Sequence, residues 1–375
     1  MIMQIFENIF KETIFLEMKI AFLINNILSF LLKSFLISKS SNKKRIIGFL
    51  PKSSAGWILE YIFRDIKEAS ESKKHHYILC KDIYSLFINT LNADYQIISL
   101  HPDYLKFLLL LGFDPKRVST ISTHQRNCKI RNIFFKVINK ILIINSYEAN
   151  SLLMKDVPKQ KIQIFPIGYS SKLFRYIPKS DDSKYREIDV LFVCRYLDRK
   201  SSNYYWIRKN YQLLIAIAKS LASKNYKVCI LGKNWLSQKE FSNQKNITFM
   251  DVNYKSYPKI YQNSKIYVSP SKQEGGPTSW LEAMASGCYV VSTLTGFSME
   301  LSDGEMYSWK IPFNRKEDDW SNFIDEILKN HRNLTKDELL IRQKFLKPSS
   351  FQDQAKVLEK ISDNKLKDPS TFWTF

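Results

Sequence analysis

Residues 266–293, IYVSPSKQEGGPTSWLEAMASGCYVVST, constrain the fold of this chain more than any other stretch. A run of β-branched and aromatic residues at 266–268 ends at Ser-Pro and predicts a buried strand. After a loop, apolar residues recur at helical spacing until Gly287, a residue suited to end a helix. Residues 289–291 predict a second strand. This order indicates a βαβ unit, and open α/β sheets bind ligands at the loop after the first strand.

The loop of this unit contains two adjacent glycines and is framed by two carboxylates. Gly275 and Gly276 let a ligand approach the backbone without a Cβ in the way. The helix start that follows directs free N–H groups to the same place, which suits a phosphate. Glu274 is expected to face a polar group of the ligand, and Glu282 could accept hydrogen bonds from vicinal hydroxyls such as those of a ribose. Ser279 and Glu282 also have capping-box spacing, so Glu282 could instead complete the helix start.

These residues resemble the E-x7-E signature of the retaining glycosyltransferases of family 4 (group 1). The likeness begins at Glu274 and covers the loop, the helix and the next strand. It implies the GT-B fold, an α/β architecture with two Rossmann-like domains whose parallel sheets face each other across a cleft. In that family the first Glu, here Glu274, contacts the donor sugar, and the second, here Glu282, binds the nucleotide ribose. Gly276 stands where Phe is common and Pro277 comes earlier than usual, which bears on the identity of the donor.

The resemblance also implies a pair of cations at the donor diphosphate. A predicted buried strand at 189–194 ends on Arg195, which matches the family's arginine at this place. Lys209 best matches the lysine that shares the diphosphate, and Lys200 is the competing candidate. Fixed positive charges there would stabilise the charge that the leaving group gains, although a surface ion pair is the alternative. The residues expected to bind the donor are Gly275, Gly276, Pro277, Thr278, Glu282 and Gly56.

Two of the candidates belong to the predicted first domain. Gly56 lies in a loop between a predicted strand at 45–50 and a predicted helix at 58–69. In the family this loop lies near the donor phosphates and the acceptor, although a turn before a helix favours such residues anyway. His124 follows the predicted strand at 118–122, at the end where ligand sites gather. Some family members have a histidine here that contacts the donor sugar, whereas an isolated loop histidine is more often simply polar.

The charge and the cysteines limit the partners of the chain. Its 375 residues carry a formal net charge of +21, which calls for an anionic partner. No nucleic-acid-binding signature is present, so we expect a membrane surface or a phosphorylated substrate and no nucleic acid. Five scattered cysteines without a C-x-x-C pair favour buried thiols in a reducing cytosol over a zinc site. The family resemblance implies no metal and no cofactor, with a nucleotide-sugar as donor substrate.

Two segments are candidates for contact with an anionic membrane. Residues 1–40 are rich in Ile, Leu and Phe, but their longest charge-free stretch, 20–32, is shorter than the ~20 residues of a spanning helix. The basic cluster that follows consists of Lys33, Lys39, Lys43, Lys44 and Arg45. This combination suits a helix lying on the leaflet, and a helix packed on the first domain is the alternative. Between Pro115 and Tyr147 there are seven basic residues and no acid, and the apolar residues at 130–138 make part of this segment a predicted basic amphipathic helix or, as the alternative, an ordinary surface helix.

Together these features predict a helical arm at 1–40, an acceptor domain at 41–176, a donor domain at 177–345 and a helix at 346–375 that returns to the first domain. The expected function is retaining, metal-independent hexosyl transfer from a nucleotide-diphosphate sugar to a sugar or lipid-linked acceptor. It would serve polysaccharide, lipopolysaccharide or glycolipid synthesis at the cytoplasmic face of the cell membrane. A non-catalytic basic module for membrane or nucleic acid is the alternative, and it leaves the paired glutamates unexplained.

Overall fold

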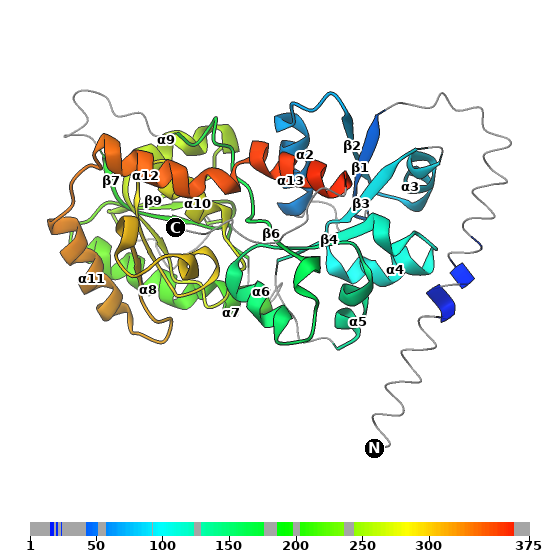
Figure 1. Cartoon of the computed structure of the whole chain (residues 1–375). Helices are drawn as coiled ribbons and strands as arrows, with labels where there is room; N and C mark the ends of the chain where they lie inside the picture. Colours follow the sequence, from blue (N-terminus) through cyan, green and yellow to red (C-terminus); the bar gives the residue numbers. More distant parts are fainter. Residues whose placement is uncertain are drawn as a thin grey trace, which may run out of the picture. The chain divides into compact units, whose positions relative to one another are not determined.

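The chain divides into two compact units in the computed structural model. The first comprises Met1–Pro166 with Phe351–Phe375, and the second comprises Ile167–Ser350. Each contains a parallel six-stranded sheet with helices packed against it (Figure 1), which confirms the predicted α/β class. The residues that the structure describes are 16–18, 20, 21, 24, 43–51, 58–91, 93–123, 129–175, 186–197, 203–235 and 244–363.

The sheet of the first unit has the strand order β2-β1-β3-β4-β5-β6, and all neighbouring strands are parallel. Its strands are β1 (Lys44–Phe49), β2 (His75–Cys80), β3 (Tyr95–Ser99), β4 (Val118–Ser122), β5 (Ile141–Ile143) and β6 (Ile162–Ile164). All residues of β4 and β5 are buried, as expected for a parallel sheet covered on both faces. The predicted strands at 45–50 and 118–122 are therefore present.

The helices of the first unit include one from the far end of the chain. They are α2 (Ile58–Ala69), α3 (Ile83–Thr90), α4 (Leu105–Leu110), α5 (Lys129–Val137), α6 (Ser146–Leu153) and α13 (Phe351–Ser362). α13 packs on α2 (Figure 1), and the Tyr77 hydroxyl of β2 donates to the Ala355 carbonyl of α13 at 3.1 Å. In α5, the side chains of Phe134 and Phe135 are buried in the core, so this helix does not offer them to a lipid surface.

The N-terminal arm is described at only a few residues, which are helical. Met18 is 7% exposed and belongs to the core of the first unit. Leu16, Ile20 and Ile24 are exposed by 58%, 50% and 50%, and their four-residue spacing places them on one helical face. The rest of the predicted arm, with Lys33 and Lys39 of its basic cluster, lies outside the described residues. Lys43 directly precedes β1, and Lys44 and Arg45 are its first two residues. Where the structure describes the chain, no helix has both the length and the apolar character needed to cross a membrane.

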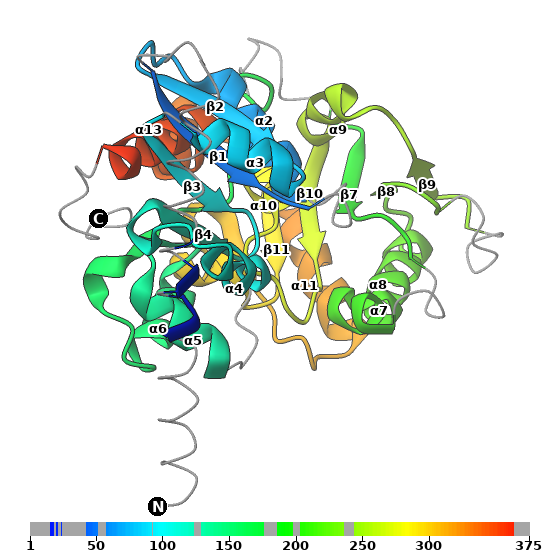
Figure 2. The same ribbon diagram turned by 90° about the vertical axis from the view of Figure 1, so that its right-hand side faces the viewer.

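The sheet of the second unit has the order β12-β11-β10-β7-β8-β9 and is also parallel. Its strands are β7 (Ile188–Val193), β8 (Val228–Leu231), β9 (Ile247–Met250), β10 (Ser264–Ser269), β11 (Tyr289–Ser292) and β12 (Ser308–Lys310). The chain builds one side of the sheet from β7 to β9, then crosses to β10 and builds the other side. β7 and β10 lie side by side (Figure 2), so the topological switch point, where such sheets bind ligands, lies between them.

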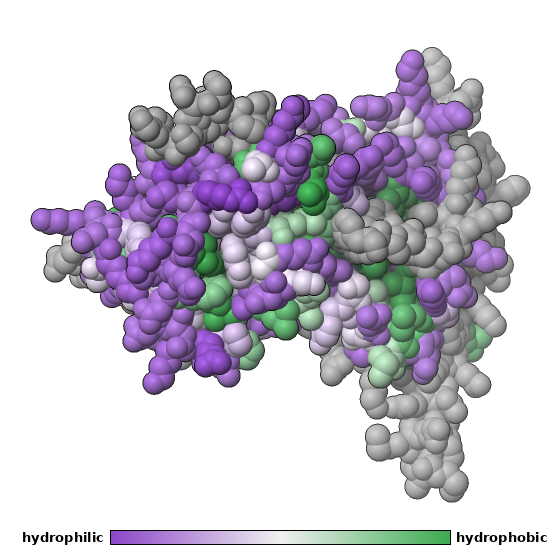
Figure 3. Space-filling view, turned by 60° about the vertical axis from the view of Figure 1, so that its left-hand side comes forward, coloured by the Kyte–Doolittle hydropathy of each residue, from purple (hydrophilic) through white to green (hydrophobic). Residues whose placement is uncertain are grey.

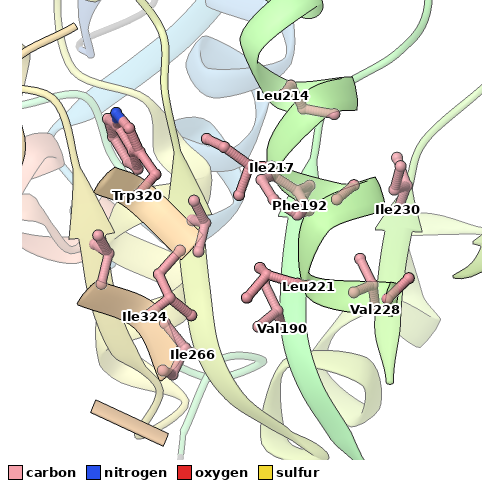
Figure 4. Packing of buried hydrophobic residues seen from close by; sticks show 14 of the residues in the cluster. Val190, Phe192, Leu214, Ile217, Leu221, Val228, Ile230, Ile266, Trp320 and Ile324 are labelled. Atoms are coloured by element: carbon pink, nitrogen blue, oxygen red, sulfur yellow. The ribbon is translucent and has the colours of Figure 1, made fainter. Parts of the chain in front are cut away.

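The second unit has its own hydrophobic core. Its helices are α7 (Asn203–Lys209), α8 (Tyr211–Ser223), α9 (Tyr257–Gln262), α10 (Thr278–Ala285), α11 (Glu317–Lys329) and α12 (Lys336–Leu346). Figure 4 shows Phe192 of β7 close to Ile217 of α8, with Trp320 and Ile324 of α11 across the same core. These four side chains are fully buried. Burial of this apolar area holds α8 and α11 against the sheet and keeps the carboxyl ends of its strands in place.

One face of the chain is largely polar where its residues are described (Figure 3). Figure 3 shows a predominantly hydrophilic face interrupted by smaller hydrophobic patches. This pattern is expected for a sequence in which 25% of the residues are charged.

Candidate functional site

The predicted glycine loop lies between β10 and α10, at the switch point of the second sheet. α10 begins at Thr278, and Pro277 is its N-cap residue without a side-chain capping bond. An added Cβ on Gly276 would lie 2.6 Å from the ring of Phe297, and one on Gly296 would lie 3.1 Å from the backbone of Gly275. The glycines therefore let two loops pack directly against each other. Packing against Phe297 accounts for Gly276 without invoking a ligand.

Glu274 is held by two cations from the end of α7. Its Oε1 accepts from Lys209 Nζ at 2.5 Å, and its Oε2 accepts from Arg208 Nη1 at 2.8 Å. The side chains of Glu274, Arg208 and Lys209 are only 6%, 12% and 15% exposed. Because two positive charges face one negative charge in a water-poor place, the group retains a surplus of one positive charge, which suits an anionic ligand.

The backbone around Glu274 is fixed from two sides. The Glu274 N–H donates to Thr295 Oγ1 at 2.8 Å, and the same hydroxyl donates to the Glu274 carbonyl at 3.1 Å. The side chain of Asn210, which joins α7 to α8 with a left-handed φ of 55°, donates to the Pro270 carbonyl at 3.1 Å. The Lys272 N–H donates to the Arg208 carbonyl at 2.8 Å. The loop and the end of α7 therefore form one hydrogen-bonded assembly.

The ion pairs set the charge state of Glu274. Burial acts to raise the pKa of its carboxyl group, but Lys209 and Arg208 outweigh burial and lower the pKa to about 2. Burial acts to lower the pKa of Lys209, and Glu274 together with Tyr205 reverses this effect and raises it. Both groups are therefore ionised at neutral pH.

The ring of Tyr205 brings the predicted cations together. The guanidinium of Arg195, which follows β7, lies 5.6 Å from the ring centroid. Arg208 and Lys209 lie 5.0 and 5.8 Å from the same centroid. The segment of Arg195 is anchored because its carbonyl accepts a hydrogen bond from the Tyr211 hydroxyl. The structure thus places Arg195, Arg208 and Lys209 within about 6 Å of one ring, and Arg208 is a cation that the sequence analysis did not name.

Glu282 lies inside α10 and is 3% exposed. Its Oε1 accepts from the Tyr254 hydroxyl at 2.5 Å, and its Oε2 accepts from the Tyr261 hydroxyl at 2.9 Å. Burial raises the pKa of Glu282 to about 7, although both tyrosine hydrogen bonds act to lower it. The capping-box alternative is wrong, because Ser279 instead pairs with the Tyr267 hydroxyl at 2.8 Å and the helix starts without a side-chain cap.

The far end of α10 is held by two buried arginines. Arg342 is 1% exposed and donates to the carbonyls of Cys288 at 2.6 Å and Met284 at 3.3 Å. Arg186 donates to the Ser286 carbonyl at 3.4 Å. These bonds place positive charge against carbonyls at and just beyond the helix C-terminus, where it is favourable to the helix dipole. They fix the helix that carries Glu282.

Several candidates cannot be placed in this site. Gly56, His124 and Lys200 lie outside the described residues. Pro277 and Thr278 form the start of α10.

The residues that sequence reasoning missed are Arg208, Tyr205, Tyr254, Tyr261 and Thr295. Of these only Arg208 had a local signal, because it stands next to Lys209 in a cationic pair. Across the described ranges, no three His, Cys, Asp or Glu side chains are grouped so that they could hold a metal ion.

Two parallel six-stranded Rossmann-like sheets, with a glycine loop at the switch point of the second, define the GT-B fold of glycosyltransferases, and solved structures agree. The chain resembles a glycosyltransferase from Rickettsia africae with 14% identity and a TM-score of 0.66, over 87% of this chain and 100% of that one. It resembles sucrose-phosphate synthase from Thermosynechococcus elongatus with 13% identity and a TM-score of 0.65, over 86% and 99%. Anabaena HepE, in complex with UDP and glucose, matches with 12% identity and a TM-score of 0.55, over 85% and 97%.

A family model connects the second unit to a particular group. Residues 204–341 match the model described as "Glycosyl transferases group 1". This segment contains Lys209, Glu274 and Glu282, and also Arg208. A search of curated proteins finds no match. The match lies within the second unit, and the candidate site lies largely within the matched segment.

Proposed function

We propose that the chain is a retaining glycosyltransferase of family 4 that transfers a hexose from a nucleotide-diphosphate sugar to a sugar or lipid-linked acceptor. The observation that carries this proposal is the buried group of Glu274, Lys209 and Arg208 beside the start of α10. It combines surplus positive charge with a helix start at the switch point, inside the segment that matches the group 1 model.

The cations have a role in bond cleavage. When the bond between the sugar C1 and the diphosphate breaks, the nucleoside diphosphate leaves with the electron pair and gains negative charge. Fixed positive groups stabilise this charge without reorganisation. Lys209 has three N–H donors and Arg208 has five, so both can bind Glu274 and still donate to a phosphate. Arg195 converges on the same place through Tyr205.

The glutamates have different assignments. Glu274 would accept hydrogen bonds from the donor sugar, since its carboxylate is ionised and its loop is fixed by Thr295. Glu282 would accept from the ribose hydroxyls. The loop backbone would lie beside the donor at Gly275, Gly276, Pro277 and Thr278. Gly56 and His124 remain candidates from the first unit.

We place the enzyme at the cytoplasmic face of the cell membrane, in the synthesis of cell-surface polysaccharide, lipopolysaccharide or glycolipid. The exposed stripe of Leu16, Ile20 and Ile24 and the net charge of +21 support association with an anionic leaflet.

A thermal-shift screen across UDP-, GDP- and ADP-sugars tests the donor. UDP-sugars come first because the HepE structure of the same fold contains UDP and glucose. We expect one nucleotide class to raise the midpoint of thermal unfolding. Sugars of that class should support transfer in the presence of EDTA. NMR of the product should show the anomeric configuration that the donor had. Strongly salt-dependent RNA binding without nucleotide-sugar binding would instead favour the non-catalytic alternative.

Transfer or donor-hydrolysis assays on Glu274→Ala and Lys209→Ala test the site. Because removal of one charge-stabilising donor costs about 10²–10³-fold in turnover, we expect a loss of that order for Lys209→Ala. We also expect Glu274→Ala to lower turnover, because the donor sugar loses an acceptor and the two cations lose their partner. Lys329→Ala is the control, since this lysine is 68% exposed and pairs with Asp325 on its own helix. Unchanged turnover in the folded site variants would remove both roles.

A further inference from the structure

The two tyrosines that bind Glu282 differ sharply in their freedom to move. Tyr261 is 0% exposed, and its ring packs against Phe174 and Tyr267. Tyr254 is 42% exposed and lies in the short 3-10 helix η6 (Tyr254–Ser256), in the loop that follows the edge strand β9. One partner of the carboxylate is therefore fixed in the core, and the other lies at the surface.

The access to Glu282 depends on the surface tyrosine. A carboxylate has about four acceptor positions, and the two tyrosine hydroxyls use two of them. The Glu282 side chain is nevertheless nearly inaccessible, with 3% exposure. A ligand hydroxyl can reach it only if a covering group moves, and of the two tyrosines Tyr254 is the one at the surface.

We propose that Tyr254 is a movable lid on Glu282. In the empty site its hydroxyl occupies Oε1, and on binding of a nucleotide it yields this oxygen to the vicinal hydroxyls of the ribose. Tyr261 keeps its bond to Oε2 in both states. This inference rests on the proposed function, and it makes Tyr254 a residue that determines how strongly an intact ribose is preferred.

The lid has a thermodynamic signature. In the empty wild type, binding of the ribose must break the bond from Tyr254 to a charged acceptor. Tyr254→Phe removes this cost and retains the ring, which contacts Phe174 and Tyr257 at centroid distances of 5.6 and 5.3 Å. Tyr261→Phe removes a bond that is present in both states, so it brings no such gain.

The test is calorimetric titration with UDP, GDP and ADP, each compared with its 2′,3′-dideoxy analogue. At pH 8.5, which keeps Glu282 ionised, we expect Tyr254→Phe to bind the ribonucleotide about tenfold more tightly than the wild type does, because a hydrogen bond to a charged group no longer has to be broken. Affinity for the dideoxy analogue should not change. Tyr257→Phe is the matched control, since this tyrosine belongs to the same aromatic cluster and is not one of the two that donate to Glu282.

The outcomes separate the two proposals. If the wild type binds one ribonucleotide and Tyr254→Phe binds it no more tightly, or binds the dideoxy analogue equally more tightly, the lid is refuted and the donor site stands. If the gain also appears in Tyr257→Phe, it does not come from the bond to Glu282, and the lid is again refuted. If the wild type binds none of the nucleotides, the proposed function fails and the lid fails with it.

Discussion

Glu274 and Glu282 are eight positions apart in the sequence (282 − 274), yet their carboxyl groups are shifted in opposite directions. The pKa of Glu274 is lowered to about 2 because its two cations outweigh burial. The pKa of Glu282 is raised to about 7 because tyrosine hydroxyls, which carry no charge, do not offset burial. Neighbouring acids of one loop and helix therefore have different chemistry, decided by whether the partner is a cation or a neutral donor.

This difference gives a pH dependence that can be measured. The folded-state pKa of Glu282 is about 7, against an ordinary value of 4.5. Between these two pH values the folded state therefore holds a proton that the unfolded state has lost. Stability from this group is therefore present below pH 4.5 and is lost as the pH rises through 7, by about 3 kcal/mol. In urea unfolding at pH 5 and pH 8, we expect Glu282→Gln to gain stability relative to the wild type at the higher pH. If the difference in unfolding free energy between Glu282→Gln and the wild type is the same at both pH values, the raised pKa is contradicted.

At the scale of elements, the glycine loop before α10 packs against η7 (Gly296–Glu300). A methyl group on Gly276 would clash with the ring of Phe297 at 2.6 Å. We expect Gly276→Ala to lower the free energy of unfolding by about 1–3 kcal/mol, the usual range for overpacking. Urea unfolding of Gly276→Ala, Phe297→Ala and the double variant forms the test. The double variant should lose less than the sum of the single variants, and simple additivity would rule out the clash.

The elements were largely predictable from sequence, whereas the partners in the site were not. Continuous apolar runs predicted the strands, and apolar residues at helical spacing up to Gly287 predicted α10, because these patterns are local. Arg208 binds Glu274 from 66 positions away, and Tyr254 binds Glu282 from 28 positions away. Such contacts arise only when the sheet brings the ends of several strands together, and no local spacing records them. The matching family pattern suggested Lys209, but it contained no signal for the tyrosines.

At the scale of the whole molecule, the arm gives a test of membrane association. Flotation with vesicles that contain phosphatidylglycerol should carry the wild type upward, because apolar insertion and positive charge act together. We expect the combined change of Leu16, Ile20 and Ile24 to serine to abolish flotation. Leu340 and Ile341, 49% and 51% exposed on α12 of the second unit, provide a control pair for the same change. Equal flotation of both variants would show that the arm does not bind the membrane.

The place of α13 in the first unit has a consequence for biosynthesis. The second unit is a continuous stretch of chain, whereas the first needs residues from both sides of it. During translation the second unit can therefore complete its fold while the first still lacks a helix that covers α2 and β1. The unit synthesised first is thus completed last, and until α13 arrives the apolar surface that this helix covers stays exposed to the solvent.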